Sequence, residues 1–325
     1  MRNRARTAPP ARTALGAGAL GMTCVGGSVA VSGVLADAPL FTAQAVRYAV
    51  ACLLLLLLAR LTGRRIEVPR GTEWCWLLGV AATGLVLFNV ALIRGSAHAE
   101  PAVLGVAVAC APVVLAVVGP LLDGTRPARP AVGAAAVVTA GAMLVQGGGR
   151  SDLAGVGWAA VVLLCEVGFT LLAVPVLRRH GPWGVSVHTC GLAGALLAVL
   201  GLVTEGPAAV SALRAPHLLA VAYLAVVVTA VAFVLWYSAV GRLGSARAGL
   251  LTGVAPIAAA AAGVLLGSPV PGPGVWAGTA LVAVGLGVGV GAAPGPRVNT
   301  RAGDHEDRPE GAWGPPSRSG GNGVR

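Results

Sequence analysis

The chain has 325 residues, of which 56% are hydrophobic and only 11% are charged, and its mean hydropathy is +0.81. Because soluble domains carry about a quarter charged residues, this composition excludes a water-facing globular surface and indicates a polytopic membrane protein. The net charge of +11 is typical of some nucleic-acid-binding proteins, but the arginines here are divided among short loops, so we expect no nucleic-acid partner.

Apolar stretches of about 20 residues, the length that spans a bilayer core, follow one another along the chain. The first has the basic start of a signal peptide, but it stays apolar to about Leu35, which favours a retained helix. We therefore predict an all-α integral membrane protein with ten transmembrane helices, near residues 14–35, 40–59, 74–93, 102–122, 131–147, 154–176, 184–203, 217–239, 246–267 and 274–292. Residues 1–13 are expected to form a basic cytoplasmic N-terminus, and residues 293–325 a disordered cytoplasmic tail.

The distribution of arginine predicts the orientation of these helices, since cytoplasmic loops carry an excess of positive charge. With a cytoplasmic N-terminus, 19 of the 23 arginines fall in cytoplasmic segments, and only Arg94, Arg150 and Arg214 fall outside. The remaining one, Arg47, lies within a predicted helix. This alternation predicts a multi-pass protein of the cell (plasma) membrane with both termini inside.

The apolar region contains an internal repeat with an offset of about 144 residues. The stretches "APVVLAVVGPLLDGTRP" (111–127) and "APIAAAAAGVLLGSPVP" (255–271) each carry a proline, Pro112 or Pro256, followed by a leucine pair that opens a loop. We therefore predict a first repeat at residues 14–147 and a second at 154–292. Each has five helices, so the second copy is inverted in the membrane, as in many transporters.

Three stretches carry a family resemblance: "AVRYAVACLLLLLLARLTGRR", "APVVLAVVGPLLDG" and, most strongly, "FVLWYSAVGRLGSARAGLLTGVAPIAAAAAGVLLGSPV". They resemble the EamA-like permeases of the drug/metabolite transporter (DMT) superfamily. That family usually has Gly-Glu after each of the two proline-containing helices, whereas this chain has Asp123-Gly124 and Gly267-Ser268. The resemblance implies a secondary-active transporter, acting in efflux of small metabolites such as amino acids or drugs by alternating access. It identifies neither the substrate nor the coupling ion, and it leaves uptake open as the direction of transport.

Glu166 is the acidic residue that lies deepest in any predicted span, within "AAVVLLCEVGFTLLAV" (159–174). Ionisable residues inside a membrane are costly and commonly functional. One hypothesis is that Glu166 binds a proton and a cationic substrate in turn, which would couple transport to proton movement. The alternative is a structural role, in which Glu166 forms a hydrogen bond to a neighbouring helix or pairs with Arg47.

Further candidates for substrate or proton binding are the other polar or aromatic residues of the spans, namely Arg47, His188, Gln44, Asn89, Trp236 and Tyr237. The guanidinium of Arg47 could bind a substrate carboxylate or reach back to the membrane interface. His188, Gln44 and Asn89 are equally typical of hydrogen bonds between helices. The two aromatic residues could line a cavity or simply pack.

Four residues are predicted to shape the helices rather than to bind. Gly249 and Gly253 are spaced for close helix packing. Pro112 and Pro256 are expected to loosen their helices beside the substrate cavity, or to form plain packing kinks.

No Walker loop, HExxH motif or Gly-x-Ser-x-Gly motif occurs, so we expect no enzyme activity and no cofactor. The cysteines lack metal-ligand spacing, so no metal is expected. The expected partners are a small-molecule substrate, protons under the coupling hypothesis, and the lipid bilayer. A homodimer could form through the glycine run "GLGVGVG" (285–291). A non-transporting scaffold or sensor, and an intramembrane enzyme, remain as alternative functions.

Overall fold

The computed structural model describes residues 11–28, 31, 34–267 and 269–292. Within these residues almost the whole chain is helical, and the one β-type contact is an isolated antiparallel bridge between Ala99 and Ser151. The all-α prediction is therefore confirmed. Most of the basic N-terminus and the whole tail at 293–325 lie outside the described residues.

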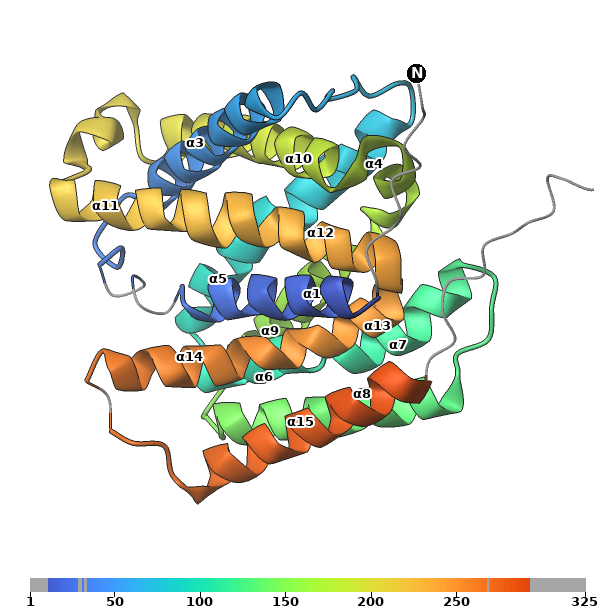
Figure 1. The fold of residues 1–325 in the computed structure, drawn as a ribbon. Helices are drawn as coiled ribbons and strands as arrows, with labels where there is room; N and C mark the ends of the chain where they lie inside the picture. The colour runs from blue at the N-terminus through green and yellow to red at the C-terminus, as the bar shows by residue number, and fades with distance from the viewer. Residues whose placement is uncertain (1–10, 29–30, 32–33, 268, 293–325) are drawn as a thin grey trace, which may run out of the picture. The chain divides into compact units, whose positions relative to one another are not determined.

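Many of the spans consist of two or three helical elements joined end to end (Figure 1). The first half contains α1 (Ala11–Gly26), α3 (Leu40–Leu61), α4 (Glu73–Val80), η1 (Ala81–Leu87), α5 (Phe88–Ser96), α6 (Pro101–Ala109), α7 (Ala111–Leu122) and α8 (Arg129–Gln146). The second half contains α9 (Leu153–Leu171), α10 (Val174–Thr204), η2 (Pro207–Ala212), α11 (Ala215–Tyr223), η3 (Leu224–Val231), α12 (Ala232–Leu243), α13 (Ser245–Leu250), η4 (Leu251–Gly253), α14 (Val254–Leu265) and α15 (Pro273–Ala292).

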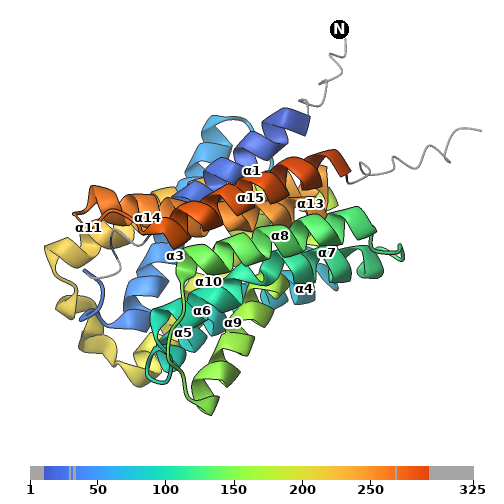
Figure 2. The same ribbon diagram turned by 90° about the horizontal axis from the view of Figure 1, so that it is seen from below.

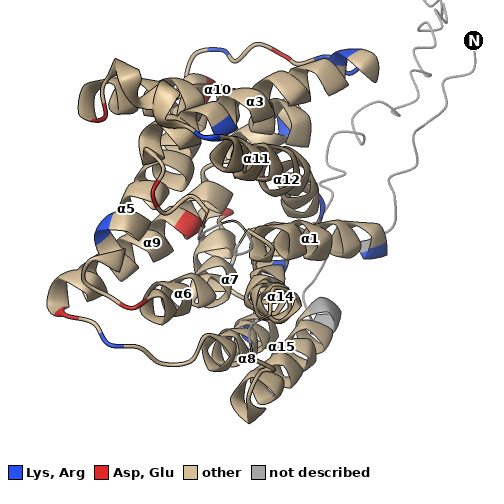
Figure 3. Cartoon of the chain, turned by 90° about the vertical axis from the view of Figure 1, so that its left-hand side faces the viewer, with Lys and Arg blue, Asp and Glu red and all other residues tan. Residues whose placement is uncertain are grey.

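Eight helices or continuous helical runs among the described residues are long and apolar enough to cross a membrane, and Pro273–Gly289 is a shorter apolar helix. Together with α1 they follow the predicted order of ten segments. Charged residues lie mostly at helix ends and in loops, and most of the helical ribbon is uncharged (Figure 3). This distribution suits a bilayer, because charged residues are costly in its hydrocarbon core.

Two boundaries differ from the prediction. The first helix is described only as far as Gly26, rather than to residue 35. The predicted loop between residues 176 and 184 is mostly helical, but it contains a non-helical break at Gly181 (φ 63°, ψ 178°), where two helices meet within α10. Glycine adopts this positive φ without strain, and Pro182 begins the helix that follows, so the predicted break is present but shorter than expected.

The two halves pack on each other in a reciprocal pattern. Corresponding helices pair across the halves, α3 with α10 and α8 with α15 (Figures 1 and 2). The first helix of the first half, α1, packs on α12 and α14, and the first helix of the second half, α9, packs on α5 and α6. This exchange of equivalent neighbours is what an inverted repeat predicts.

Breaks in the helices recur at equivalent places in the halves. The π-helical turns η1 and η3 interrupt equivalent spans. Pro112 lies just after the break between α6 and α7, and Pro256 lies just after η4. Because π-helical turns are frequent at functional sites, the space between η1 and η3 is a candidate functional site.

Glycines bring several helices into close contact. A Cβ on Gly249 would lie 2.9 Å from the Cβ of Leu115, and one on Gly253 would lie 2.5 Å from Cγ1 of Val138. In the run at 285–291, a Cβ on Gly285 would lie 2.9 Å from the backbone nitrogen of Val138 on α8. Part of this run therefore packs within the chain, and a homodimer stays a prediction.

The contact between α8 and α15 provides a test of this packing. A Cβ on Gly278 would lie 2.6 Å from the backbone oxygen of Gly141, so we expect Gly278→Ala to lower the free energy of unfolding by about 1–3 kcal/mol through overpacking. Gly287→Ala on the same helix is the matched control, since a Cβ there has no atom within 4 Å. Thermal unfolding of the purified protein measures both. Equal melting temperatures for the two variants would contradict the packing.

Candidate functional site

A cavity of about 210 Å³ lies between the two halves of the bundle. It is lined by α1, α3, η1 and α5 of the first half and by α9, η3 and α12 of the second. Both π-helical turns therefore border it. The lining residues are Met22, Val25, Ser28, Arg47, Tyr48, Gly84, Leu85, Phe88, Asn89, Leu92, Glu166, Phe169, Val228, Ala232, Phe233 and Trp236.

Glu166 lies in the second half of α9 and faces this cavity. Its carboxyl group makes no hydrogen bond or ion pair with any residue that the structure describes. The repeat offset assigns Met22 of α1 as its counterpart, and Met22 lines the same cavity. The side-chain partners that a structural role would require are thus not observed here.

Arg47 faces the cavity from α3 and is held by neutral groups. Its Nε donates to Oγ1 of Thr229 at 2.8 Å, and its Nη1 donates to Oε1 of Gln44 at 3.2 Å. Its guanidinium carbon lies 5.0 Å from the centre of the Tyr48 ring, whose hydroxyl accepts a hydrogen bond from Asn89 at 3.4 Å. Because Thr229 belongs to the other half, these contacts hold the cation at the interface between the repeats.

Aromatic rings form much of the cavity wall. Three of the four phenylalanines of the chain, Phe88, Phe169 and Phe233, line it together with Trp236. Tyr237 lies behind this wall, where it is fully buried and its hydroxyl donates to the carbonyl of Phe169 at 3.4 Å. An apolar wall with a few polar groups is the usual form of a small-molecule site.

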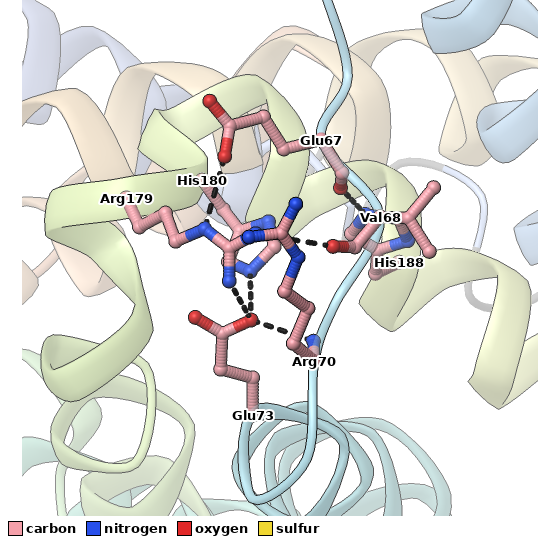
Figure 4. Close-up of polar contacts among 7 residues, drawn as sticks. All are labelled: Glu67, Val68, Arg70, Glu73, Arg179, His180 and His188. Atoms are coloured by element: carbon pink, nitrogen blue, oxygen red, sulfur yellow. Dashed lines mark hydrogen bonds and ion pairs between the residues drawn. The ribbon is translucent and has the colours of Figure 1, made fainter.

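The predicted site residues therefore separate into three groups. Glu166, Arg47, Asn89 and Trp236 come together in the cavity, while Gln44 and Tyr237 support residues that line it. His188 lies elsewhere: its Nε2 is 2.9 Å from the backbone oxygen of Glu67, to which it must donate because a carbonyl only accepts (Figure 4).

An ionic cluster joins the two halves at the predicted cytoplasmic end of α3 and α10. Glu73 accepts hydrogen bonds from Nη1 of Arg179 at 2.6 Å, from the backbone nitrogen of Arg70 at 2.8 Å and from Nε2 of His180 at 3.2 Å (Figure 4). Arg179 also binds Glu67 at 3.0 Å. We call these five residues the inner cluster.

A second set of contacts joins the halves at the opposite end of α3 and α10. Asp37 pairs with Arg214 and accepts from Nε2 of His217 at 3.1 Å. Glu205 accepts from the backbone nitrogen of Thr42 at 2.9 Å and from its hydroxyl at 2.7 Å. Desolvation opposes ionisation of Asp37, but the hydrogen bond from His217 and the charge of Arg214 hold its pKa below the usual value. We call these five residues the outer cluster.

The comparisons with known proteins agree with this arrangement. A sequence model of the EamA-like transporter family matches residues 12–146 and again residues 153–289. The chain belongs to the EamA-like transporter family. The protein is therefore a multi-pass membrane transporter built from two family repeats.

Two similar proteins support this assignment. The uncharacterized transporter YdeK of Bacillus subtilis (strain 168) is 30% identical over 191 residues, which cover 58% of this chain and 66% of that protein. The match thus spans just under two thirds of that relative. A crystal structure of another protein, 19% identical in sequence, matches this EamA-like chain with a TM-score of 0.75. The match covers 86% of this chain and 98% of the other chain, which shows that the two share a fold.

Sequence reasoning missed several residues that shape the cavity. Tyr48 follows Arg47 directly, and Thr229 interrupts an apolar run, so their polarity was a usable signal. The repeat offset could also have paired Gly84 with Val228, because both lie in the π-helical turns. The ionic clusters had no such signal, since most of their members lie in predicted loops and the paired residues are far apart in the sequence.

The hydrogen bond between Arg47 and Thr229 can be tested by mutation. Thr229→Val removes the acceptor of a partly buried guanidinium, so we expect the free energy of unfolding to fall by about 1–3 kcal/mol. Thr279→Val is the matched control, because the hydroxyl of Thr279 bonds only to its own helix, at the carbonyl of Val275. Thermal unfolding in detergent measures both. A control that is destabilised as much as Thr229→Val would refute the special role of this bond.

Proposed function

We propose that this EamA-like transporter is a secondary-active exporter of small metabolites in the plasma membrane, working by alternating access. The observation that supports it best is the cavity between the halves, in which one guanidinium and one carboxyl group stand without a partner of opposite charge among the described residues. Inverted-repeat carriers bind their substrate at this position.

The chemistry of the cavity favours solutes such as amino acids or amine-containing drugs. Arg47 suits a substrate carboxylate, because its planar fork matches that group. Glu166 suits an ammonium group, and the aromatic rings of Phe169 and Trp236 suit an apolar side chain. A solute carrying both charges would supply each side chain with the partner that it lacks.

Glu166 also gives the proposal a route for proton coupling. A carboxyl group binds either a proton or a cation at one time, so the two ligands exclude each other. If the transporter can switch between its inward-open and outward-open conformations with either a proton or a solute bound, a proton moving inward is exchanged for a solute moving outward. No further ionisable group is needed for this exchange.

The two ionic clusters suit the task of closing the cavity at its two ends. Each joins one half of the transporter to the other, at opposite ends of the packed pair α3 and α10. Alternating access requires one end to open while the other stays closed. We propose that the inner cluster breaks when the cavity opens to the cytoplasm, and that the outer cluster breaks when it opens outward.

The variant Glu166→Gln tests the coupling. The amide keeps the shape of the side chain but cannot exchange a proton at neutral pH. In proteoliposomes that contain a pH-sensitive dye, a panel of amino acids and amines should drive proton movement through the wild-type protein. We expect Glu166→Gln to reduce this signal to the level of protein-free liposomes. Solute-for-solute exchange should persist but require a higher solute concentration, because the ammonium group loses its partner while Arg47 still binds the carboxylate.

The control for this experiment is Glu100→Gln. Glu100 is an exposed carboxylate that pairs with Arg150 at 2.9 Å, far from the cavity lining, so its variant should keep full proton-linked transport. Normal proton movement in Glu166→Gln would end the coupling hypothesis. Loss of both proton movement and solute exchange would instead assign Glu166 to solute binding alone.

The clusters are tested by the accessibility of the cavity. A cysteine at Ala232, which lines the cavity, is introduced into a variant without native cysteines and labelled with a membrane-impermeant maleimide. We expect Glu73→Gln to increase labelling from the cytoplasmic side, because Arg179 and His180 lose their shared acceptor. Asp37→Asn should increase labelling from the outer side.

Glu100→Gln serves again as control and should change neither rate. Right-side-out and inside-out vesicles distinguish the two sides. If both cluster variants changed labelling from the same side, the clusters would not act as opposite closures.

A further inference from the structure

A second cavity, of about 540 Å³, lies at the predicted cytoplasmic end of α3. One wall consists of α3 and α10, which contribute Leu56 and Leu192, and the segment after α3 folds over it with Ile66. Arg60 and Arg64 stand at one end, where α3 finishes. We call this cavity the inner groove. It is separate from the central cavity, with which it shares no lining residue.

The charged end of the inner groove is not neutralised by the protein. Arg60 and Arg64 form no ion pair with any residue in the part of the chain that the structure describes. The guanidinium of Arg64 instead lies over the Trp183 ring, 5.0 Å from its centre. The nearest carboxylate along the chain, that of Glu67, is turned to Arg179 at 3.0 Å. The inner groove is thus apolar along most of its length and cationic at the end where α3 finishes.

The position of the inner groove places it next to lipid. Leu53 and Leu57 on the same part of α3 are 67% and 54% exposed, as expected for side chains that face acyl chains. Trp74, which lines the groove, is a residue type enriched at the membrane interface. A molecule that enters from the bilayer could keep its polar head at the arginines and its tail along the leucines.

We propose that the inner groove binds one anionic phospholipid. The phosphate lies between Arg60 and Arg64, and the first part of an acyl chain lies along Leu56, Ile66 and Leu192. Basic pockets between helices on the cytoplasmic side are suited to anionic headgroups. A free phosphate ester would leave the apolar wall uncovered, and a zwitterionic lipid would bring its own cation toward two guanidinium groups. The proposal does not depend on transport, because no residue of the central cavity takes part.

Native mass spectrometry of the full chain in detergent tests the proposal. The probe is an equimolar mixture of phosphatidylglycerol and phosphatidylcholine with identical acyl chains. We expect the wild type to retain phosphatidylglycerol preferentially. In the double variant Arg60→Gln and Arg64→Gln, each lost charge should weaken retention roughly five-fold, so that the pair weakens it about 30-fold.

The matched control replaces Arg126 and Arg129 by glutamine. These two exposed arginines lie three residues apart, close to the four-residue spacing of Arg60 and Arg64, and they are at the predicted cytoplasmic side but outside the groove. It should keep the preference of the wild type. Leu192→Trp, which fills the groove without changing its charge, should also lower retention of phosphatidylglycerol. If the double variant fails to elute and melt like the wild type, the two single variants replace it.

Three results would overturn the proposal. Equal retention of both lipids by the wild type would remove the charge preference. Unchanged retention in the arginine variants would place the lipid elsewhere. Displacement of phosphatidylglycerol by millimolar glycerol 3-phosphate would show a site for the free phosphate ester rather than for a phospholipid. None of these results bears on transport through the central cavity.

Discussion

Two ionisable side chains, Arg47 and Glu166, line the central cavity inside the membrane-spanning bundle, and neither forms an ion pair with any residue that the structure describes. Unpaired charges in an apolar interior are far more costly than charges in water. Arg47 offsets part of this cost through Thr229 and Gln44, which are neutral acceptors. Glu166 has no such partner among the described residues. Under the proposed function, a proton or the cationic group of a solute would be the partner of its carboxyl group.

The rest of the bundle divides into rigid and interrupted parts. Where α8 meets α15, the glycines Gly141 and Gly278 bring two backbones together, which favours a fixed contact. Where the halves meet around the cavity, η1 and η3 replace regular α-helix. π-helical turns are rare and are frequent at functional sites. Both turns contribute residues to the cavity lining, so the interrupted parts of the bundle adjoin the proposed binding residues.

The sequence was sufficient to predict the architecture because each signal there is strong and local. Span length, the alternation of arginine-rich loops and the repeated proline stretches can each be read directly along the chain, without knowledge of tertiary contacts. The site was harder. Glu166, Arg47, Asn89 and Trp236 were found by their unusual polarity or size within apolar runs, and they share one cavity. His188 has the same signature, yet the kink at Gly181 and the segment that follows α3 place it by Glu67. Only tertiary packing distinguishes these cases.

The fold repeats, but its charges do not. By the offset of 144 residues between the two halves, Arg47 of the first half corresponds to Gly191, and Glu166 of the second half corresponds to Met22. Each charged residue therefore has a neutral counterpart, so one half contributes a cation to the cavity and the other half an acid. In the proposed mechanism, the approximate symmetry of the helices would allow the bundle to adopt two related conformations. The asymmetric charges would keep a bound solute in one orientation in both conformations, so that the barrier changes sides while the solute stays in place.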